Sequence, residues 1–463
     1  MYPIVILSIT GLITLFLGFL KSRKILLPAT ILFLLIAVAA GFLDWNKPGL
    51  YFNAMIDINN TSIIFGAIIL ITAILILPLS AGRFDDETAH PAEYYAIMQM
   101  SLVGAIIMVS FQNLIMLFVG IEILSVALYV LTGSDKRNLR GNEAALKYFL
   151  MGSFATGILL FGIAMYYGAT GSFNISASMA LIKSSHEGKI FFWIGIFFML
   201  IGLLFKVSAA PFHFWTADVY EGAPTFFTTF MATVVKTAGF YAIFKLISVS
   251  FSSEFAVWSN LIIGAIVLSL SIGNISAVYQ SSFKRLLAFS SISQAGYMLL
   301  SVIGMSNQSE ESLAFYSVSY SLASISAFGV LMVVSKNTLE NGRPNESISV
   351  FNGLLKKSPF LAVILSISLF SLSGIPLTAG FWGKFFVFSD AAYRNLTWLL
   401  VFAVIMSAVG IYYYFKPIIA ALFKDTENSN TIEIYPAVKV CLFLTTLGTI
   451  IFGLFPNLVR SFF

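Results

Sequence analysis

Long runs of apolar residues constrain this chain more than any other feature of its sequence. The segments PIVILSITGLITLFLGFL (3–20) and SIIFGAIILITAILILPLSAG (62–82) are each long enough to cross a bilayer, which takes about 20 helical residues. Such runs must be helices, because lipid offers the backbone no hydrogen-bond partner. Only 10% of the 463 residues are charged, against about 25% in soluble domains. The sequence therefore predicts an all-α polytopic membrane protein. It excludes a β-barrel, whose strands would alternate polar and apolar residues.

About fourteen such runs divide the chain. We expect spans near 3–20, 26–43, 61–82, 92–110, 112–132, 143–168, 190–212, 224–247, 255–278, 285–304, 312–335, 358–392, 395–422 and 435–459. No connecting loop is long enough to form a soluble domain, so a single membrane domain is expected. The first run lacks the basic start and the small-residue cleavage site of a signal peptide. We therefore expect it to be a retained helix.

The positions of Lys and Arg predict the orientation. Cytoplasmic loops of membrane proteins carry an excess of these residues. An even number of spans puts both termini on one side. If that is the outer side, the inner loops collect most of the basic residues, among them Lys136, Arg137 and Lys356, and the outer side collects fewer, among them Lys245 and Arg394. We therefore expect both termini outside, and the net charge of +5 then indicates topology and not nucleic-acid binding.

Two of the expected spans contain a break. The seventh, LLFKVSAAPFHFW, places Lys206 five residues before Pro211, and the twelfth, LSGIPLTAGFWGKFF, places Lys384 eight residues after Pro376. Proline removes a helix hydrogen bond and clashes with the preceding turn. Interrupted helices at corresponding positions of two halves mark ion sites in transporters. Since the breaks lie five spans apart, we expect inverted five-helix repeats; a kink that serves packing alone is the structural alternative.

This organisation predicts four parts within one membrane domain. They are an N-terminal group of three helices, two inverted five-helix repeats and a C-terminal helix, at residues 1–90, 91–250, 251–425 and 426–463.

Four charged residues lie deep inside expected spans: Glu122, Lys206, Lys236 and Lys384. A charge at a helix centre costs roughly 2.5–3.5 kcal/mol on insertion scales, so such residues are expected to have a function. Burial disfavours an ammonium group and a nearby carboxylate favours it. We predict Glu122 and Lys206 as a switching pair, Lys236 as the next relay and Lys384 as the last. A static ion pair or a polar anchor between helices is the structural alternative.

Other titratable residues lie nearer the ends of the spans. Glu143 and Lys147 are four residues apart, as in a helical ion pair, and Lys147 could load protons from the cytoplasm. His213 follows Pro211, and its side chain titrates in the range of a proton shuttle, although a packing role is equally consistent with its place. Asp218 and Glu221 are expected to be solvated acids in the loop before the eighth span.

The sequence predicts no cofactor or metal site in this chain. Cys441 is the one cysteine, too few for a disulfide framework or a cysteine-ligated cluster. The three histidines, His90, His186 and His213, have no metal-ligand spacing, and neither a phosphate-binding loop nor a dinucleotide fingerprint is present.

Three stretches resemble subunit N of the bacterial NADH–quinone oxidoreductase, respiratory complex I. They are KVSAAPFHFWTADVYEGAPTFFTTFMATVVKTAGFY (206–241), SSFKRLLAFSSISQAGYMLL (281–300) and SLSGIPLTAGFWGKFFVF (371–388). The resemblance covers essentially the whole chain, and DVYEGAPT is specific to subunit N among its antiporter-like relatives. One departure is Phe226, where the family usually has proline.

The resemblance implies inverted five-helix repeats in spans 4–8 and 9–13, each with a broken helix. The family's buried glutamate falls on Glu122, its broken-helix lysine on Lys206, its central lysine on Lys236 and its distal lysine on Lys384. Lys147 matches a further family lysine. The expected partners are subunit M, small membrane subunits and lipid, in a bacterial inner membrane. NADH, FMN, iron–sulfur clusters and quinone would belong to the whole complex.

The predicted function is therefore proton translocation, coupled to quinone reduction in other subunits of an NADH–quinone oxidoreductase. A subunit of a multisubunit cation/proton antiporter is the alternative, since it uses similar buried lysines. A structural membrane scaffold is a third possibility, and it predicts that the buried charges can be replaced without effect.

Overall fold

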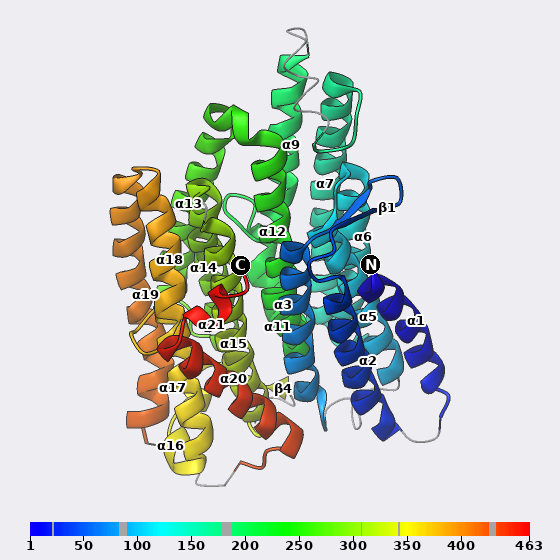
Figure 1. Ribbon diagram of the computed structural model, residues 1–463. Coiled ribbons are helices and arrows are strands. Elements are labelled where there is room, and N and C mark those ends of the chain that lie inside the picture. The colour runs from blue at the N-terminus through cyan, green and yellow to red at the C-terminus, as the bar shows by residue number, and fades with distance from the viewer. Residues whose placement is uncertain (21–22, 83–89, 177–187, 307, 341–342, 426–431) are drawn as a thin grey trace. The chain divides into compact units, whose positions relative to one another are not determined.

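The computed structural model describes residues 1–20, 23–82, 90–176, 188–306, 308–340, 343–425 and 432–463. Helices make up most of it (Figure 1). The chain divides into two compact units: Met1–Ile74, Asp85–Trp215 and Val234–Ala265 form the first, and Leu75–Phe84, Thr216–Thr233 and Ile266–Phe463 form the second. The predicted four-part division stays a prediction.

The first unit contains the N-terminal helices and the first broken span. Its helices are α1 (Tyr2–Leu17), α2 (Leu26–Gly41), α3 (Asn60–Ile76), α5 (Pro91–Ser110), α6 (Leu114–Thr132), α7 (Leu139–Thr170), α9 (Lys189–Lys206) and α12 (Lys236–Leu246). Helices α7 and α9 approach closely where Gly162 faces Gly195, because a Cβ on Gly162 would lie 2.7 Å from the backbone nitrogen of Met199. Small residues permit such backbone contacts in membranes.

The second unit contains most of α10 (Phe214–Gly222) and α13 (Phe255–Val278), and the later helices. These are α11 (Thr225–Phe230), α14 (Phe283–Gly304), α15 (Ser309–Lys336), α16 (Leu354–Lys357), α17 (Pro359–Ser373), α18 (Ala379–Tyr393), α19 (Thr397–Phe423), α20 (Pro436–Leu454) and α21 (Asn457–Arg460). Within this unit α15 packs against α17, α18 and α20, and α14 packs against α18. The buried side chains of α14 and α15 therefore form much of its interior.

Short elements join or extend the helices. The 3₁₀ turns are η1 (Arg23–Ile25), η2 (Phe42–Asp44), η3 (Leu77–Ser80), η6 (Ser252–Glu254) and η7 (Ile348–Phe351), and the π turns are η4 (Met231–Val235) and η5 (Ile247–Phe251). Two antiparallel hairpins, which the sequence analysis did not predict, pair β1 (Gly49–Tyr51) with β2 (Ile56–Ile58) and β3 (Leu339–Glu340) with β4 (Arg343–Pro344). Positive φ angles at Phe52, Asn53 and Ala54 turn the first hairpin.

The helices fit the expected spans. In the described residues eleven helical stretches are long and apolar enough to cross a membrane, and α1 and α17 are shorter apolar helices. One of the eleven, Thr225–Val278, is a continuous helical stretch of 54 residues that covers two expected spans. An all-α polytopic membrane protein is thus confirmed, while the count of fourteen and the inverted repeats stay predictions.

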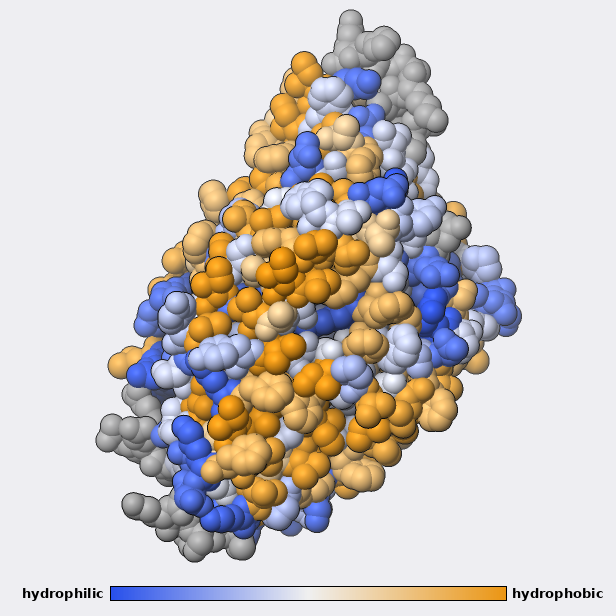
Figure 2. Space-filling view, turned by 90° about the vertical axis from the view of Figure 1, so that its left-hand side faces the viewer, coloured by the Kyte–Doolittle hydropathy of each residue, from blue (hydrophilic) through white to orange (hydrophobic). Residues whose placement is uncertain are grey.

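Apolar side chains cover much of the face that Figure 2 shows. On α19 the exposed side chains include Trp398, Val401, Val404 and Ile405, each about half exposed. An exterior of this kind is stable in lipid or against another apolar surface, and not in water.

Both predicted breaks are present in the chain. Helix α9 ends at Lys206, earlier than the expected limit near residue 212. The following backbone contains Ser208 in the left-handed region (φ 62°) and a cis bond before Pro211. In the twelfth span, α17 ends at Ser373 and α18 begins at Ala379.

Candidate functional site

Lys206 is the last residue of α9 and is 4% exposed. Its Nζ donates hydrogen bonds to Ser125 Oγ on α6 at 2.7 Å and to Tyr148 Oη on α7 at 3.4 Å. The Tyr148 ring stacks on Trp215 with centroids 4.6 Å apart. Trp215 in turn donates from Nε1 to Phe205 O at 3.1 Å, so the aromatic pair is fixed to the end of α9. Lys206 is therefore held by hydroxyl groups from two neighbouring helices.

Glu122 lies one turn before Ser125 on α6, close enough to interact electrostatically with Lys206. Its Oε1 is buried and has no hydrogen-bond partner within 3.5 Å among the described residues. Glu122 therefore acts on Lys206 as a nearby charge. The direct hydrogen-bond partner of the ammonium group is Ser125. Ser125 and Tyr148 were missed by the sequence analysis; the available signal was that Ser125, three residues after Glu122, shares its helix face.

Lys236 is the first residue of α12 and is 1% exposed. It follows the π turn η4 directly, and π turns occur frequently at functional sites. One turn further on, a Cβ at Gly239 would lie 2.6 Å from Val207 Cγ1. The absent side chain at Gly239 lets α12 pass directly beside the break that follows Lys206, so the first unit brings α9 and α12 together there.

Lys384 belongs to the second unit and is 5% exposed. Its Nζ donates to Ser373 O at 2.7 Å and to Ser407 Oγ at 2.9 Å, and lies 4.9 Å from the centroid of the Tyr297 ring. Ser373 is the last residue of α17. The carbonyls at a helix C-terminus lack intrahelical partners and carry partial negative charge. The break therefore supplies Lys384 with a backbone acceptor.

A polar cluster surrounds this lysine in the second unit. A cavity of about 10 Å³ next to Lys384, enough for about one water molecule, is lined by Gln294, Tyr316, Ser319, Tyr320, Ser371, Leu372, Gly380 and Lys384. Gln294 donates to Leu372 O at 3.1 Å and to Tyr414 Oη at 3.0 Å, and Tyr316 donates to Gln294 Oε1. The sequence analysis missed these groups, whose only signal was the frequency of Ser, Gln and Tyr in α14 and α15.

Lys147 and His213 have different surroundings. Lys147 pairs with Glu143 at 2.8 Å on α7, with both side chains substantially exposed, as the spacing predicted. His213 lies in the segment between α9 and α10, is 7% exposed and stacks on Phe214. A place for either residue on the proton path stays a prediction.

Asp218 and Glu221 are not the solvated loop acids that we expected. They lie on α10, and Nη1 of Arg285 on α14 pairs with both, at 3.1 Å and 2.7 Å respectively. The adjacent Lys284 is buried and donates to Ala223 O at 2.6 Å and to Glu346 Oε1 at 3.1 Å. That expectation was wrong because α10 continues the chain as a helix beside α14.

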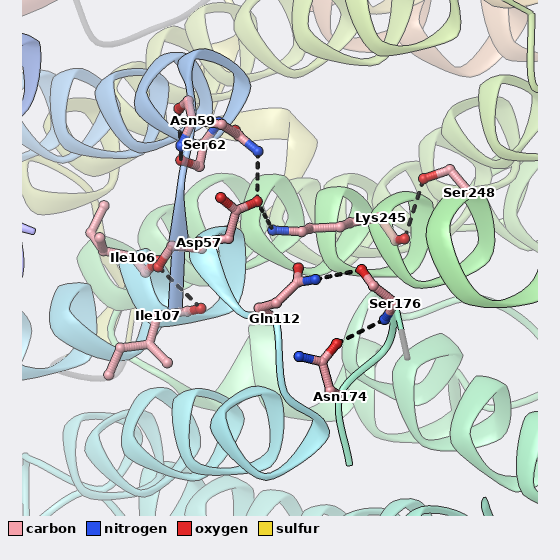
Figure 3. A network of polar contacts seen from close by, with 11 residues as sticks. Asp57, Asn59, Ser62, Ile106, Ile107, Gln112, Asn174, Ser176, Lys245 and Ser248 are labelled. Carbon is pink, nitrogen blue, oxygen red and sulfur yellow. Dashed lines mark hydrogen bonds and ion pairs between the residues drawn. The ribbon is translucent and has the colours of Figure 1, made fainter. Parts of the chain in front are cut away.

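Lys245, which we expected near the outer end of the eighth span, is buried. It lies within α12 and is 5% exposed, with its Nζ 3.5 Å from Asp57 Oδ2 in the β1–β2 hairpin (Figure 3). Asn59 donates to the same carboxylate at 2.9 Å. The first unit therefore contains a second buried lysine on α12, nine residues after Lys236.

No group of three or more His, Cys, Asp and Glu side chains in the described part of the chain could hold a metal ion. His186 lies outside the described residues.

The chain is similar to known proteins over the region that contains these residues. The family model described as "NADH:quinone oxidoreductase/Mrp antiporter, TM" matches residues 112–410, a range that contains Glu122, Lys206, Lys236 and Lys384. Two similar curated proteins are named NADH-quinone oxidoreductase subunit N. The one from Cytophaga hutchinsonii is 38% identical over 99% of this chain and 98% of its own length. The one from Flavobacterium johnsoniae is 41% identical over 98% of each.

Solved structures share the fold over nearly the whole chain. A chain of respiratory complex I from Thermus thermophilus is 32% identical, with a TM-score of 0.84 over 99% of this chain and 98% of that one. A chain of the Mrp complex from Dietzia has a TM-score of 0.84 at 19% identity, over 99% of this chain and 95% of that one. At that identity the likeness shows the fold alone.

Proposed function

The chain belongs to the NADH-quinone oxidoreductase subunit N family, and from that premise we propose that it translocates protons through Glu122, Lys206, Lys236 and Lys384, driven by quinone reduction elsewhere in the complex. It is an antiporter-like membrane subunit whose partners are other membrane subunits. NADH, FMN, the iron–sulfur clusters and quinone belong to the rest of the complex in this proposal. A single cysteine supports that assignment, because a cysteine-ligated cluster needs four.

The observation that carries the proposal is a buried lysine at each of the two breaks. Lys206 is the residue at which α9 ends, and Lys384 donates to the carbonyl at which α17 ends. Charged groups in membrane interiors mark ion or proton pathways, and helix interruptions at the same depth supply polar backbone to them. Two packing kinks would need no lysine at either place.

Glu122 and Lys206 form the input in this mechanism. Electron transfer in partner subunits changes the field or the position of the Glu122 carboxylate. When the carboxylate is near, the Lys206 ammonium is favoured; when it withdraws, burial favours the neutral amine, and the proton leaves. In the structure Nζ is oriented by its hydrogen bonds to Ser125 and Tyr148. Lys147 and His213 are candidates for loading protons from the cytoplasm.

Lys236 receives the proton next, and Lys384 is the last lysine of the proposed order. Water and hydroxyl groups carry the proton between them. The polar cluster of Gln294, Tyr316 and Tyr414 near Lys384 supports this part of the proposal, since each of these side chains can both donate and accept a hydrogen bond.

Replacement of Lys236 tests the proposal in the assembled complex. The variant Lys236→Ala is expected to assemble and to reduce proton pumping per electron in proteoliposomes fuelled with NADH and quinone. Lys356→Ala is the matched control, because this lysine is exposed and pairs with Asp425 at 2.5 Å. Normal pumping by Lys236→Ala would remove Lys236 from the path.

The second candidate is a subunit of a multisubunit cation/proton antiporter, favoured by the shared fold with the Mrp chain. Copurification distinguishes the two. Elution of a tagged chain with flavin and iron–sulfur subunits supports the first, and elution with antiporter subunits alone supports the second.

A further inference from the structure

Asp390 is a buried carboxylate that the proposed lysine path does not use. It lies on α18, six residues after Lys384, and is 3% exposed. Its Oδ1 accepts a hydrogen bond from Ser306 Oγ at 2.7 Å. Its Oδ2 is buried and has no hydrogen-bond partner within 3.5 Å among the described residues. Burying a carboxylate oxygen without a hydrogen-bond partner costs free energy, so this unsatisfied oxygen calls for an explanation.

The end of α14 holds this carboxylate in place. Helix α14 ends at Gly304, where an added Cβ would lie 2.6 Å from Asp390 Cβ and 2.7 Å from Asp390 O. The chain then turns through Met305 (φ 43°) into Ser306, whose hydroxyl lies 3.1 Å from that of Ser309. Ser301, Ser309 and Ser312 also lie around the carboxylate. Asp390 is therefore enclosed by hydroxyl groups at the end of the second unit where α14 and α18 end.

Unsatisfied buried polar atoms lie beside both Asp390 and Lys384. Tyr297 and Ser301 are four residues apart on α14 and share one face. Tyr297 Oη and Ser301 Oγ are both buried and, like Asp390 Oδ2, have no partner within 3.5 Å among the described residues. The Lys384 ammonium lies over the Tyr297 ring at 4.9 Å, and Ser301 is close to the Asp390 carboxylate. From Tyr297 to Gly304 the helix rises about 10 Å.

Buried hydroxyl groups beside both residues suit proton transfer through water. Buried polar groups are almost always hydrogen-bonded, and polar groups slightly too far apart for direct contact are bridged by water. Hydroxyl groups both donate and accept, so a row of them with intervening water conducts a proton. A carboxylate at the end of such a row accepts it.

We propose that Asp390 is the release group of this subunit: it takes the proton that leaves Lys384 and passes it to the side on which both termini are predicted to lie. The step rests on the proposed proton translocation. The Lys384 ammonium loses one proton and becomes the neutral amine, the Asp390 carboxylate becomes the carboxylic acid, and water outside then takes the proton from Asp390. No covalent bond other than these N–H and O–H bonds changes.

The neighbouring charges leave Asp390 available for this role. At the same end of the second unit, Arg460 pairs with Glu311 at 3.0 Å, and Arg394 Nε donates to Gly304 O at 2.8 Å. Glu311, near the start of α15, is an acid that already has an arginine partner. It is therefore a matched control for the removal of a carboxylate.

The test uses the assembled complex in proteoliposomes, with NADH-driven electron transfer and proton pumping measured together. Asp390→Asn keeps the shape of the side chain. It is expected to lower the number of protons pumped per electron transferred by as much as Lys384→Ala does. The double variant should be no lower than Lys384→Ala alone, because the two residues act in series. Asp390→Glu should recover pumping at least in part, and Glu311→Gln should pump normally.

Each other outcome has a definite meaning. If Asp390→Asn pumps normally while Lys384→Ala is impaired, Asp390 is not the release group, although the proposed function stands. If Asp390→Asn only lowers the amount of assembled complex, with normal pumping per complex, the carboxylate has a structural role and the inference is wrong. If Lys236→Ala and Lys384→Ala both pump normally, the proposed function itself fails.

Discussion

At the scale of single residues, hydroxyl groups decide how the buried lysines are held. Lys206 has Ser125 and Tyr148 as partners, and Lys384 has Ser407. The charges could be found from the sequence because a lysine inside an apolar run is conspicuous. Their partners could not, because Ser and Tyr are frequent in these helices and only tertiary packing selects one of them.

Replacement of Ser125 by alanine tests this at the first break. A hydrogen bond to a charged group contributes about 1.5–3 kcal/mol, so Ser125→Ala is expected to impair pumping and lower thermal stability while the complex still assembles. Ser125→Thr should retain both properties. Ser110→Ala is the control, since in the described part of the chain the Ser110 hydroxyl donates to carbonyls of its own helix. Equal behaviour of Ser125→Ala and Ser110→Ala would contradict a role for Ser125.

The ion pairs of Arg285 and Lys284 differ in burial, so the loss of each should cost a different amount of stability. The side chain of Arg285 is about one-third exposed in its pairs with Asp218 and Glu221, and exposed pairs contribute about 0.2–1 kcal/mol each. Lys284 is buried and pairs with Glu346, whose side chain is 23% exposed; breaking a fully buried pair costs about 3–5 kcal/mol, which is an upper bound here. Thermal unfolding in detergent should therefore find Lys284→Gln clearly less stable than Arg285→Gln. If Arg285→Gln is the less stable variant, the Arg285 pairs contribute more to stability than the Lys284 pair, against this prediction.

At the scale of elements, the sequence predicted the helices well and their interruptions only roughly. Long apolar runs predict spans because lipid leaves the backbone no other structure. Helix α9 ends several residues before Pro211. The backbone N–H groups of Val207 and Ala209 donate to carbonyls of its last turn and close it there. The burial of Lys245 was missed because the continuation of helical structure through η5 depends on packing that no local pattern reports.

Gly374 is a position at the second break where both the backbone and the space require glycine. It ends α17 with φ 86°, and a Cβ there would lie 2.8 Å from Lys384 Cδ. We expect Gly374→Ala to displace Lys384, to lower pumping towards the level of Lys384→Ala and to cost about 1–3 kcal/mol of stability through backbone strain. Gly157→Ala is the control, because nothing lies within 4 Å of its added Cβ. Normal pumping by Gly374→Ala would mean that Lys384 tolerates displacement.

At the scale of the whole molecule, composition was enough to predict the class and too little to predict the arrangement. A chain with 10% charged residues is predicted to lie in a membrane. The two compact units of the structure follow tertiary contacts between segments distant in sequence, such as α14 with α18 and α15 with α20. Composition and periodicity contain no information about such pairs.

The predicted orientation has a direct test. Because inner loops would carry most of the Lys and Arg, single cysteines placed near Met1 and Phe463 should react with an impermeant thiol reagent added to whole cells. Cys441 would first be replaced by serine to remove the natural thiol. Labelling only in inverted vesicles would reverse the predicted orientation.

The two breaks differ in what they offer their lysines. Ser373 O, which accepts from Lys384, is a peptide group: it cannot titrate and no substitution removes it. Lys206 depends on side chains and on a carboxylate that can change its charge. In the proposed path, the first break can therefore change how strongly it holds a proton, while the backbone acceptor at the second break stays constant. Control of the path would then lie at the first break.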